Sequence, residues 1–212
     1  MGVRSYGQYC GLARGLDLIG DRWVLLIVRE LLNGPRRYGE LLDGLPGIAT
    51  NLLAERLRTM QDNGLVVKVD DDHYRLTDRG EGLREVLYAI GRWAYPLMGE
   101  LTAGETFRSH WIAHPIAALF PGVDDTRPEL SIEVRTDGEP MTVRSRAGRV
   151  MVEWGPAAAP DLVLTGPPDA IVGLFARRLG TEEAKRRGVV ITGDARRLRK
   201  LRPDVPAGVI RR

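Results

Sequence analysis

The chain has 212 residues, of which 43% are hydrophobic and 28% are charged. This supports packed cores in one large or two small domains, and no long low-complexity tract interrupts them. No apolar run approaches the roughly 20 residues that cross a bilayer, and the first residues lack an apolar signal region, so we expect a cytoplasmic protein without a membrane partner. The single cysteine, Cys10, excludes an intramolecular disulfide and fits a reducing compartment.

The net charge of +3 is not concentrated in the first half of the chain. Residues 1–100 carry 13 basic and 14 acidic side chains, which gives a net charge of about −1 there and +4 in the remainder. Bulk charge therefore does not argue for nucleic-acid binding by the first half. Any such contact depends on local clusters of arginine.

Apolar residues repeat at helical spacing through the first 32 residues. They are Leu12, Leu16, Ile19, Trp23, Ile27 and Leu31. Gly20 and Asp21 interrupt the repeat, and Asp21 is a suitable N-cap for a second helix over residues 22–32. That helix ends at residues 33–35, because Gly34 tolerates a left-handed cap and Pro35 cannot continue a helix.

Residues 34–80 have the pattern of a winged helix-turn-helix. The elements expected in order are a short helix over 38–42, a tight turn at 46–48, a long helix over 49–63, and two strands over 65–69 and 73–77. A helix held behind such a turn fits the major groove of DNA, and the hairpin can lie along the adjacent backbone. The pattern predicts a DNA-binding regulator.

The long helix divides into two faces. Leu53, Leu57 and Met60 share the face that packs on the core, whereas Thr50, Asn51 and Arg58 lie among the residues on the other face. We expect these three polar residues to contact bases, since asparagine pairs bidentately with adenine and arginine with guanine.

Phosphate contacts are expected around this helix. Arg36, Arg37 and Tyr38 precede the short helix, where side chains and helix N-terminal amides can hold a phosphate, and Arg75 on the wing can do the same. Arg56 lies to one side of the reading face, so a phosphate contact and an internal salt bridge are equally compatible with its position.

The wing tip is acidic. The three carboxylates of Asp70, Asp71 and Asp72 repel phosphates. Three explanations remain open: the tip is lifted away from DNA, the wing helps to hold a dimer, or the affinity is lower than usual. We expect no metal there, because a bare hairpin tip supplies no enclosing ligand shell.

A further helix begins at residues 77–80 and carries a wide apolar stripe. Its members are Leu83, Val86, Leu87, Ile90, Trp93 and Leu97. A second subunit is one way to cover such a stripe at the end of a small domain, which favours a homodimer.

The pattern changes near Thr102. An apolar helix over residues 105–120 and a loop over 121–128 precede four short strands, over 130–134, 141–144, 150–154 and 162–165. A helix over 168–179, a buried strand over 188–193 and a final helix capped by Asp194 follow. The sequence predicts an α+β protein with a DNA-binding and dimerisation domain (residues 1–102), a helix and linker (103–128) and a mixed α/β domain (129–212).

Seven apolar residues of the second half are candidates for a ligand cavity. They are Trp111, Leu119, Phe120, Trp154, Ile171, Leu174 and Phe175. Each is equally compatible with an ordinary core, because a sequence does not reveal missing volume.

His110 and His114 have metal-ligand spacing but no further ligand nearby, so we expect no metal. The absence of a nucleophile elbow, a Cys–His pair and a phosphate-binding glycine loop favours a protein that is not an enzyme and needs no cofactor.

From Cys10 to Trp93 the sequence resembles the HxlR family of bacterial winged-helix regulators. The resemblance rests on residues 16–23, 31–38, 40–41, 45–48, 51–53, 55–57, 64–66 and 74–80. It implies a dimer on a palindromic DNA operator, with the first and last helices of the domain forming the interface.

In some relatives the cysteine aligned with Cys10 senses quinones, aldehydes or oxidants, which requires a lowered pKa and solvent access. The alternative is an inert cysteine packed in the dimer interface.

Residues 159–166, 169–171 and 189–194 make the second half similar to the sterol carrier protein 2-like fold. This resemblance implies an apolar cavity between a sheet and helices, without indicating a particular lipid. The combined expectation is a homodimeric repressor controlled by an apolar small-molecule effector. The alternatives are a hydrophobic-ligand carrier that uses the winged helix only for dimerisation, a redox-sensing regulator that uses Cys10, and an enzyme built on the second cavity, against which the lack of a nucleophile–base pair argues.

Overall fold

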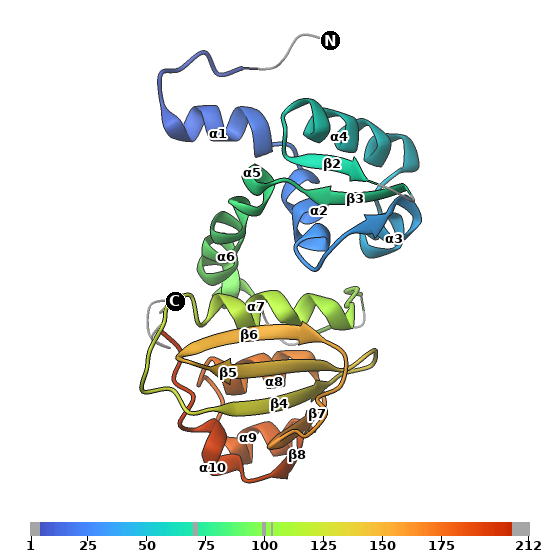
Figure 1. Cartoon of the computed structure of the whole chain (residues 1–212). Helices are drawn as coiled ribbons and strands as arrows, with labels where there is room; N and C mark the ends of the chain where they lie inside the picture. The colour runs from blue at the N-terminus through green and yellow to red at the C-terminus, as the bar shows by residue number, and fades with distance from the viewer. Residues whose placement is uncertain (1–4, 70–71, 99–100, 103, 205–212) are drawn as a thin grey trace. The chain divides into compact units, whose positions relative to one another are not determined.

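A computed structural model of the chain describes residues 5–69, 72–98, 101–102 and 104–204. It separates into two compact units, residues 1–87 and 88–212, which are described one at a time (Figure 1). The division falls inside α6 (Leu83–Ala94), whereas the sequence pattern placed a domain boundary after residue 102. The second half of α6 belongs to the second unit because Arg92 donates a hydrogen bond to the Ala118 carbonyl (3.2 Å) and Tyr95, just beyond α6, packs against the second core.

The first unit is a winged helix-turn-helix, as the sequence predicted. Its elements are α1 (Gly11–Ile19), α2 (Val24–Leu31), β1 (Arg36–Arg37), α3 (Tyr38–Gly44), α4 (Thr50–Asp62), β2 (Val66–Val69), β3 (His73–Leu76), α5 (Asp78–Glu81) and the start of α6. The three strands form an antiparallel sheet in the order β1-β3-β2, with Arg36 opposite Tyr74 and Val66 opposite Leu76. The short strand β1 was not expected from the sequence.

A single apolar core holds the helices of this unit. Ile27 and Leu31 of α2, Leu41 of α3, and Leu53 and Leu57 of α4 are all buried in it. This packing fixes α4 against α2 and α3 through its leucine face, so the orientation of the opposite face is set by the core.

Local geometry sets where the helices of the first unit end. Gly34 (φ +113°) follows α2, and Gly64 (φ +67°) follows α4, as expected. The expected N-cap role of Asp21 is wrong: residues 21–23 form a turn, α2 begins at Val24, and the Asp21 carboxylate pairs instead with Arg56. The Thr77 hydroxyl accepts a hydrogen bond from the Gly80 amide (3.1 Å) and starts α5.

The second unit is built on a five-stranded mixed sheet in the order β6-β5-β4-β7-β8. Its elements are the 3₁₀ turns η2 (Tyr95–Leu97) and η3 (Ser109–Ile112), α7 (Ala113–Ala118), β4 (Leu130–Arg135), β5 (Met141–Arg146), β6 (Arg149–Trp154), β7 (Leu162–Thr165), α8 (Pro168–Phe175), α9 (Thr181–Arg186), β8 (Val190–Gly193) and α10 (Ala195–Leu198). Strands β4 and β7 are parallel, and the other neighbours are antiparallel.

Two expected helices of this unit differ from the observed ones. The helix expected over residues 105–120 is regular only from Ser109 to Ala118. The helix expected over 168–179 ends at Phe175, because Arg177 adopts a left-handed conformation (φ +56°), and a separate helix, α9, follows. The expected N-cap of the last helix is confirmed, since the Asp194 carboxylate accepts a hydrogen bond from the Arg196 amide (3.0 Å).

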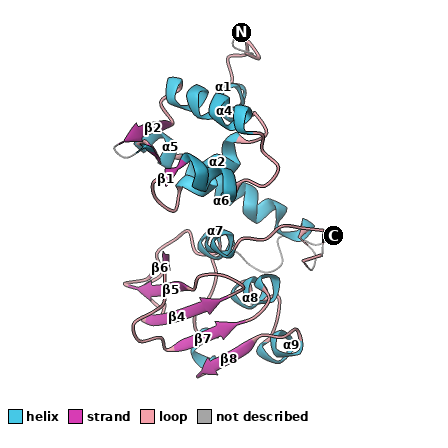
Figure 2. Cartoon of the chain, turned by 90° about the vertical axis from the view of Figure 1, so that its right-hand side faces the viewer, coloured by secondary structure: helices cyan, strands magenta, loops and turns pink. Residues whose placement is uncertain are grey.

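Helices cover one face of the sheet. Leu130, Ile132 and Val134 of β4 are buried in a core shared with α7 and α8 (Figures 1 and 2). Because strand residues alternate between faces, Ser131 and Arg135 lie on the opposite face, which carries polar side chains.

None of the helices in the described part of the chain combines the length and hydropathy needed to cross a membrane.

Candidate nucleic-acid interface

Helix α4 presents a polar face opposite its core face. Leu53, Leu57 and Met60 are at most 1% exposed, which fixes the rotation of the helix about its axis. Thr50, Asn51 and Arg58 are exposed. The first turn of α4 is therefore open to a ligand along its polar side, which is the geometry that base reading by a recognition helix requires.

Tyr38 connects the two helices of the motif. Its hydroxyl donates a hydrogen bond of 2.5 Å to the carbonyl of Thr50, the first residue of α4. Sequence reasoning assigned Tyr38 only to a phosphate contact. The structure adds an orienting role, because this bond joins the start of α3 to the start of α4.

Arg36 and Arg37 precede α3 and differ in their surroundings. Glu40 lies 4.0 Å from Arg36 and also accepts a hydrogen bond from the Arg37 amide (2.7 Å). The Arg37 side chain is exposed. Glu40 thus satisfies one orphan amide at the start of α3 and reduces the local positive charge.

Arg56 forms an internal network. Its guanidinium lies 3.1 Å from Glu55 and 3.5 Å from Asp21, and its side chain is only 18% exposed. Of the two roles left open by the sequence, this arrangement favours the salt bridge. The pair with Asp21 ties α4 to the turn between α1 and α2.

One of the three carboxylates at the wing tip is paired with a cation. Lys68 of β2, which the sequence reasoning did not consider, pairs with Asp72 at 2.7 Å. The hydrogen bond and charge of Lys68 lower the pKa of the Asp72 carboxyl. Asp70 and Asp71 lie outside the described residues. Arg75 of β3 is exposed and accessible to a phosphate.

A buried ion pair supports the turn before α4. Glu30 of α2 is 3% exposed and pairs with Arg29 at 2.7 Å, and the Arg29 guanidinium also donates to the Gly44 carbonyl (3.4 Å). Burial lowers the pKa of Arg29. A Cβ atom on Gly44 would lie 2.5 Å from the Glu30 carboxylate, so a larger residue there would have to displace the Glu30 side chain. An acid within the apolar run of α2 was the signal that sequence reasoning overlooked.

Helices α1 and α6 expose large apolar side chains. On α1 the most exposed is Leu12 (72%). On α6 and the turn after it, Trp93 and Leu97 are 73% and 77% exposed, and Ile90 is also exposed. Exposed apolar stripes of this kind mark protein interaction surfaces.

Cys10 occupies the N-cap position of α1 and is exposed. The thiol makes no capping hydrogen bond of ordinary geometry, but the nearby backbone amides of Ala13 and Leu12 lower its pKa. Solvent access and a lowered pKa are the two properties that a reactive thiol needs.

Most of the candidate cavity residues of the second unit lie in its core. Leu119, Phe120, Ile171, Leu174 and Phe175 are buried members of one packed cluster. Trp111 is half-buried and Trp154 exposed, and the ring of His110 lies 5.5 Å from that of Trp154 and 6.0 Å from that of Trp111. A ligand-binding role for the seven residues stays a prediction.

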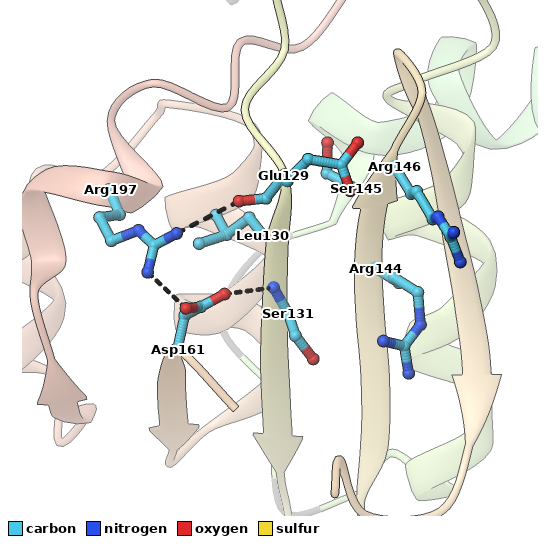
Figure 3. A pocket seen from close by; sticks show the side chains of 8 residues that line it. All are labelled: Glu129, Leu130, Ser131, Arg144, Ser145, Arg146, Asp161 and Arg197. Carbon is cyan, nitrogen blue, oxygen red and sulfur yellow. Dashed lines mark hydrogen bonds and ion pairs between the residues drawn. The ribbon is translucent and has the colours of Figure 1, made fainter. Parts of the chain in front are cut away.

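The second unit also contains a polar pocket that sequence reasoning missed. It has a volume of about 440 Å³ and is lined by Glu129, Leu130, Ser131, Arg144, Ser145, Arg146, Asp161 and Arg197 (Figure 3). These residues come from β4 and the residue before it, β5, α10 and the segment before β7, so no local sequence pattern joins them. Within the described ranges, no three His, Cys, Asp or Glu side chains are grouped to hold a metal ion.

Residues 18–101 match the HxlR-like helix-turn-helix family. The HTH-type transcriptional regulator YvaP of Bacillus subtilis is 36% identical over 90 residues, which are 38% of this chain and 81% of YvaP. The regulator sll1512 of Synechocystis sp. is 37% identical over 90 residues, covering 40% of this chain and 67% of the relative. A crystal structure of quinone-bound YodB from B. subtilis is 33% identical, covers 41% of this chain and 98% of YodB, and has a TM-score of 0.39.

Proposed function

The chain belongs to the HxlR-like helix-turn-helix family of transcriptional regulators, and on this premise we propose that it is a homodimeric repressor whose second unit binds a small-molecule effector. The observation that carries the proposal is the exposed polar face of α4, opposite a leucine face buried in the core. Each subunit of the dimer would place α4 in the major groove of one half of a palindromic operator, about one helical turn from its twin.

Two further features support a dimer. The exposed apolar residues of α1 and those of α6 each need a partner, and a second copy of the chain offers the same surfaces in return. The two helices are the first and last of the DNA-binding region. We propose that both contribute to the interface between the subunits.

The second unit is proposed to have the sterol carrier protein 2-like fold and to bind an apolar effector. What supports this is a mixed sheet with α7 and α8 on one face. Because five of the seven candidate residues are packed in the core, an apolar ligand must displace side chains or enter beside Trp111 and Trp154. Effector binding would then change the spacing between the α4 helices of the two subunits. This needs only a few kcal/mol of difference in the effector's affinity for the two arrangements.

A mobility-shift titration with the DNA upstream of the chain's own gene tests the proposal. We expect a discrete complex with two chains per operator and repression of transcription from that promoter in a purified system. Failure of the chain to bind any fragment of this region more tightly than random DNA contradicts the proposal. Extraction of an apolar ligand without any DNA shift would instead favour the carrier alternative.

A second candidate function is thiol-based sensing by Cys10. Its exposure and the lowered pKa of its thiol favour this function. Treatment of the DNA-bound chain with a quinone should release the DNA, and the Cys10→Ser variant should be insensitive. Equal release of both chains contradicts the sensing role and leaves the DNA-binding proposal intact.

A further inference from the structure

The polar pocket of the second unit lies on the sheet face that the helices leave open. Leu130, Ile132 and Val134 of β4 point into the core, so the alternating residue Ser131 points to the other face. Ser131 lies opposite Arg144 of β5. Figure 3 shows Arg146 and Arg144 one above the other along β5, with their side chains extending away from β4 and from the Asp161–Arg197 pair on its other side. The pocket therefore includes polar residues of the open face, and one of its lining residues, Leu130, also belongs to the apolar core.

The acidic groups of the pocket are already satisfied by the protein. One carboxylate oxygen of Asp161 accepts a hydrogen bond from the Ser131 amide (2.8 Å), and the other pairs with Arg197. The carboxylate of Glu129 accepts a hydrogen bond from the Ala147 amide (2.9 Å). Both carboxylate oxygens of Asp161 and one of Glu129 are therefore already bound by the protein.

Two arginines of this region, in contrast, have no ion-pair partner among the described residues. Arg146 at the end of β5 lies directly opposite Arg149 at the start of β6. Both are exposed, and neither has an ion pair with any residue that the structure describes. Arg144, two residues earlier on the same face, pairs with Glu153 at 3.3 Å, and these two side chains are 38% and 45% exposed.

Two like charges directly opposite one another destabilise an antiparallel pair of strands. The hairpin could avoid this cost with any neutral residue at either position. An anion placed between the two guanidinium groups removes the repulsion, because planar guanidinium groups bind phosphate and carboxylate oxygens in pairs.

We propose that this pocket binds a small molecule that carries a phosphate or carboxylate group. Its principal ligands are Arg146, which lines the pocket, and the cross-strand neighbour Arg149, which is not among the lining residues; the lining residue Arg144 is a third. The volume of about 440 Å³ suits a metabolite rather than a lone ion. The anion-binding site itself follows from the second unit alone, whereas its role as an effector site rests on the proposed function.

Isothermal titration of the full chain with pyrophosphate, at constant ionic strength and without DNA, tests the site. The test variant is Arg146→Gln/Arg149→Gln. The matched control is Arg199→Gln/Lys200→Gln, which removes the same two positive charges from exposed positions of the same unit outside the pocket. Inorganic phosphate and citrate, titrated in parallel, distinguish a preference for phosphate from one for carboxylate.

We expect saturable binding of one pyrophosphate per chain, at least tenfold weaker in the test variant and within twofold of wild type in the control. No saturable binding to wild type, or equal weakening in both variants, overturns the proposal. A second arm measures the DNA affinity of each variant as a function of salt concentration. If the test variant alone has a lower affinity and a smaller salt dependence, these arginines contact DNA phosphates, and the proposal of an anion-binding pocket is overturned. Because the first arm contains no DNA, its result stands whether or not the chain represses transcription.

Discussion

The hydroxyl of Tyr38 donates a hydrogen bond of 2.5 Å to the carbonyl of Thr50, and this contact joins the beginning of α3 to the beginning of α4. The carbonyl belongs to the first turn of the helix that presents Thr50 and Asn51. A side chain of the helix-turn-helix motif therefore holds the reading end of α4 in position.

The Tyr38→Phe variant tests this relationship. Loss of the hydrogen bond should lower the free energy of unfolding by about 1 kcal/mol and weaken operator binding several-fold. Tyr74→Phe is the matched control, because the Tyr74 ring is also half-buried and its hydroxyl makes no hydrogen bond with the described residues. Urea unfolding and a mobility-shift titration measure both effects, and unchanged stability of Tyr38→Phe would refute the orienting role.

The buried carboxylate of Glu30 should be a major stabilising element of the first unit. Glu30→Ala removes the carboxylate that pairs with the largely buried Arg29 and opens a cavity beside Gly44. We expect a loss of about 3 kcal/mol in the free energy of unfolding. The exposed Glu85→Ala on α6 should change it by less than about 0.5 kcal/mol. Similar losses for the two variants in urea titrations would show that the buried pair is dispensable.

The proposed dimer interface is tested at two of its exposed apolar residues, Trp93 and Leu12. Trp93→Glu and Leu12→Glu should each weaken self-association by about 2 kcal/mol, or roughly 30-fold, because a carboxylate would be buried against apolar surface. Val190→Glu on β8 is the control, since Val190 is also exposed but belongs to neither α1 nor α6. Sedimentation velocity measures the distribution of species. A wild-type chain that stays monomeric at micromolar concentration contradicts the account.

The Cys10 thiol should ionise at a lower pH in the folded chain than in the unfolded chain, because backbone amides of α1 stabilise the thiolate. A depressed pKa means that this contribution to stability is fully present above the pKa of the unfolded thiol and disappears as the pH falls through the folded pKa. The rate of alkylation by iodoacetamide against pH should therefore have a lower midpoint in buffer than in concentrated urea. Coincident midpoints would remove the basis for a sensing role.

The sequence predicted the first unit well because its determinants are local. The periodic leucines of α4, the glycine after each of α2 and α4, and the alternating strands of the wing are each visible within a short window. The polar face of α4 followed directly from the spacing of Leu53, Leu57 and Met60. The boundaries of α4 and of both long wing strands were correct to within one residue.

The differences have two physical origins, namely partners far away in sequence and a local backbone conformation that the sequence does not signal. Asp21 was expected to cap α2 and instead meets Arg56, 35 positions later along the chain. The break after α8 depends on the left-handed conformation of Arg177, which a non-glycine residue rarely adopts and no propensity signals. The arginine pocket requires the register of β5 against β4 and β6, which only the folded sheet defines.

The most direct test of the central claim is the operator affinity of the Asn51→Ala/Arg58→Ala variant on the natural operator and on operators with single base substitutions. Gln61→Ala is the control, since Gln61 is exposed on α4 but lies in its last turn. If α4 reads bases, each lost contact costs about 1–3 kcal/mol per half-site, and the variant no longer distinguishes the substituted operators at those positions. Wild-type affinity and wild-type base preference in the double variant would contradict the account.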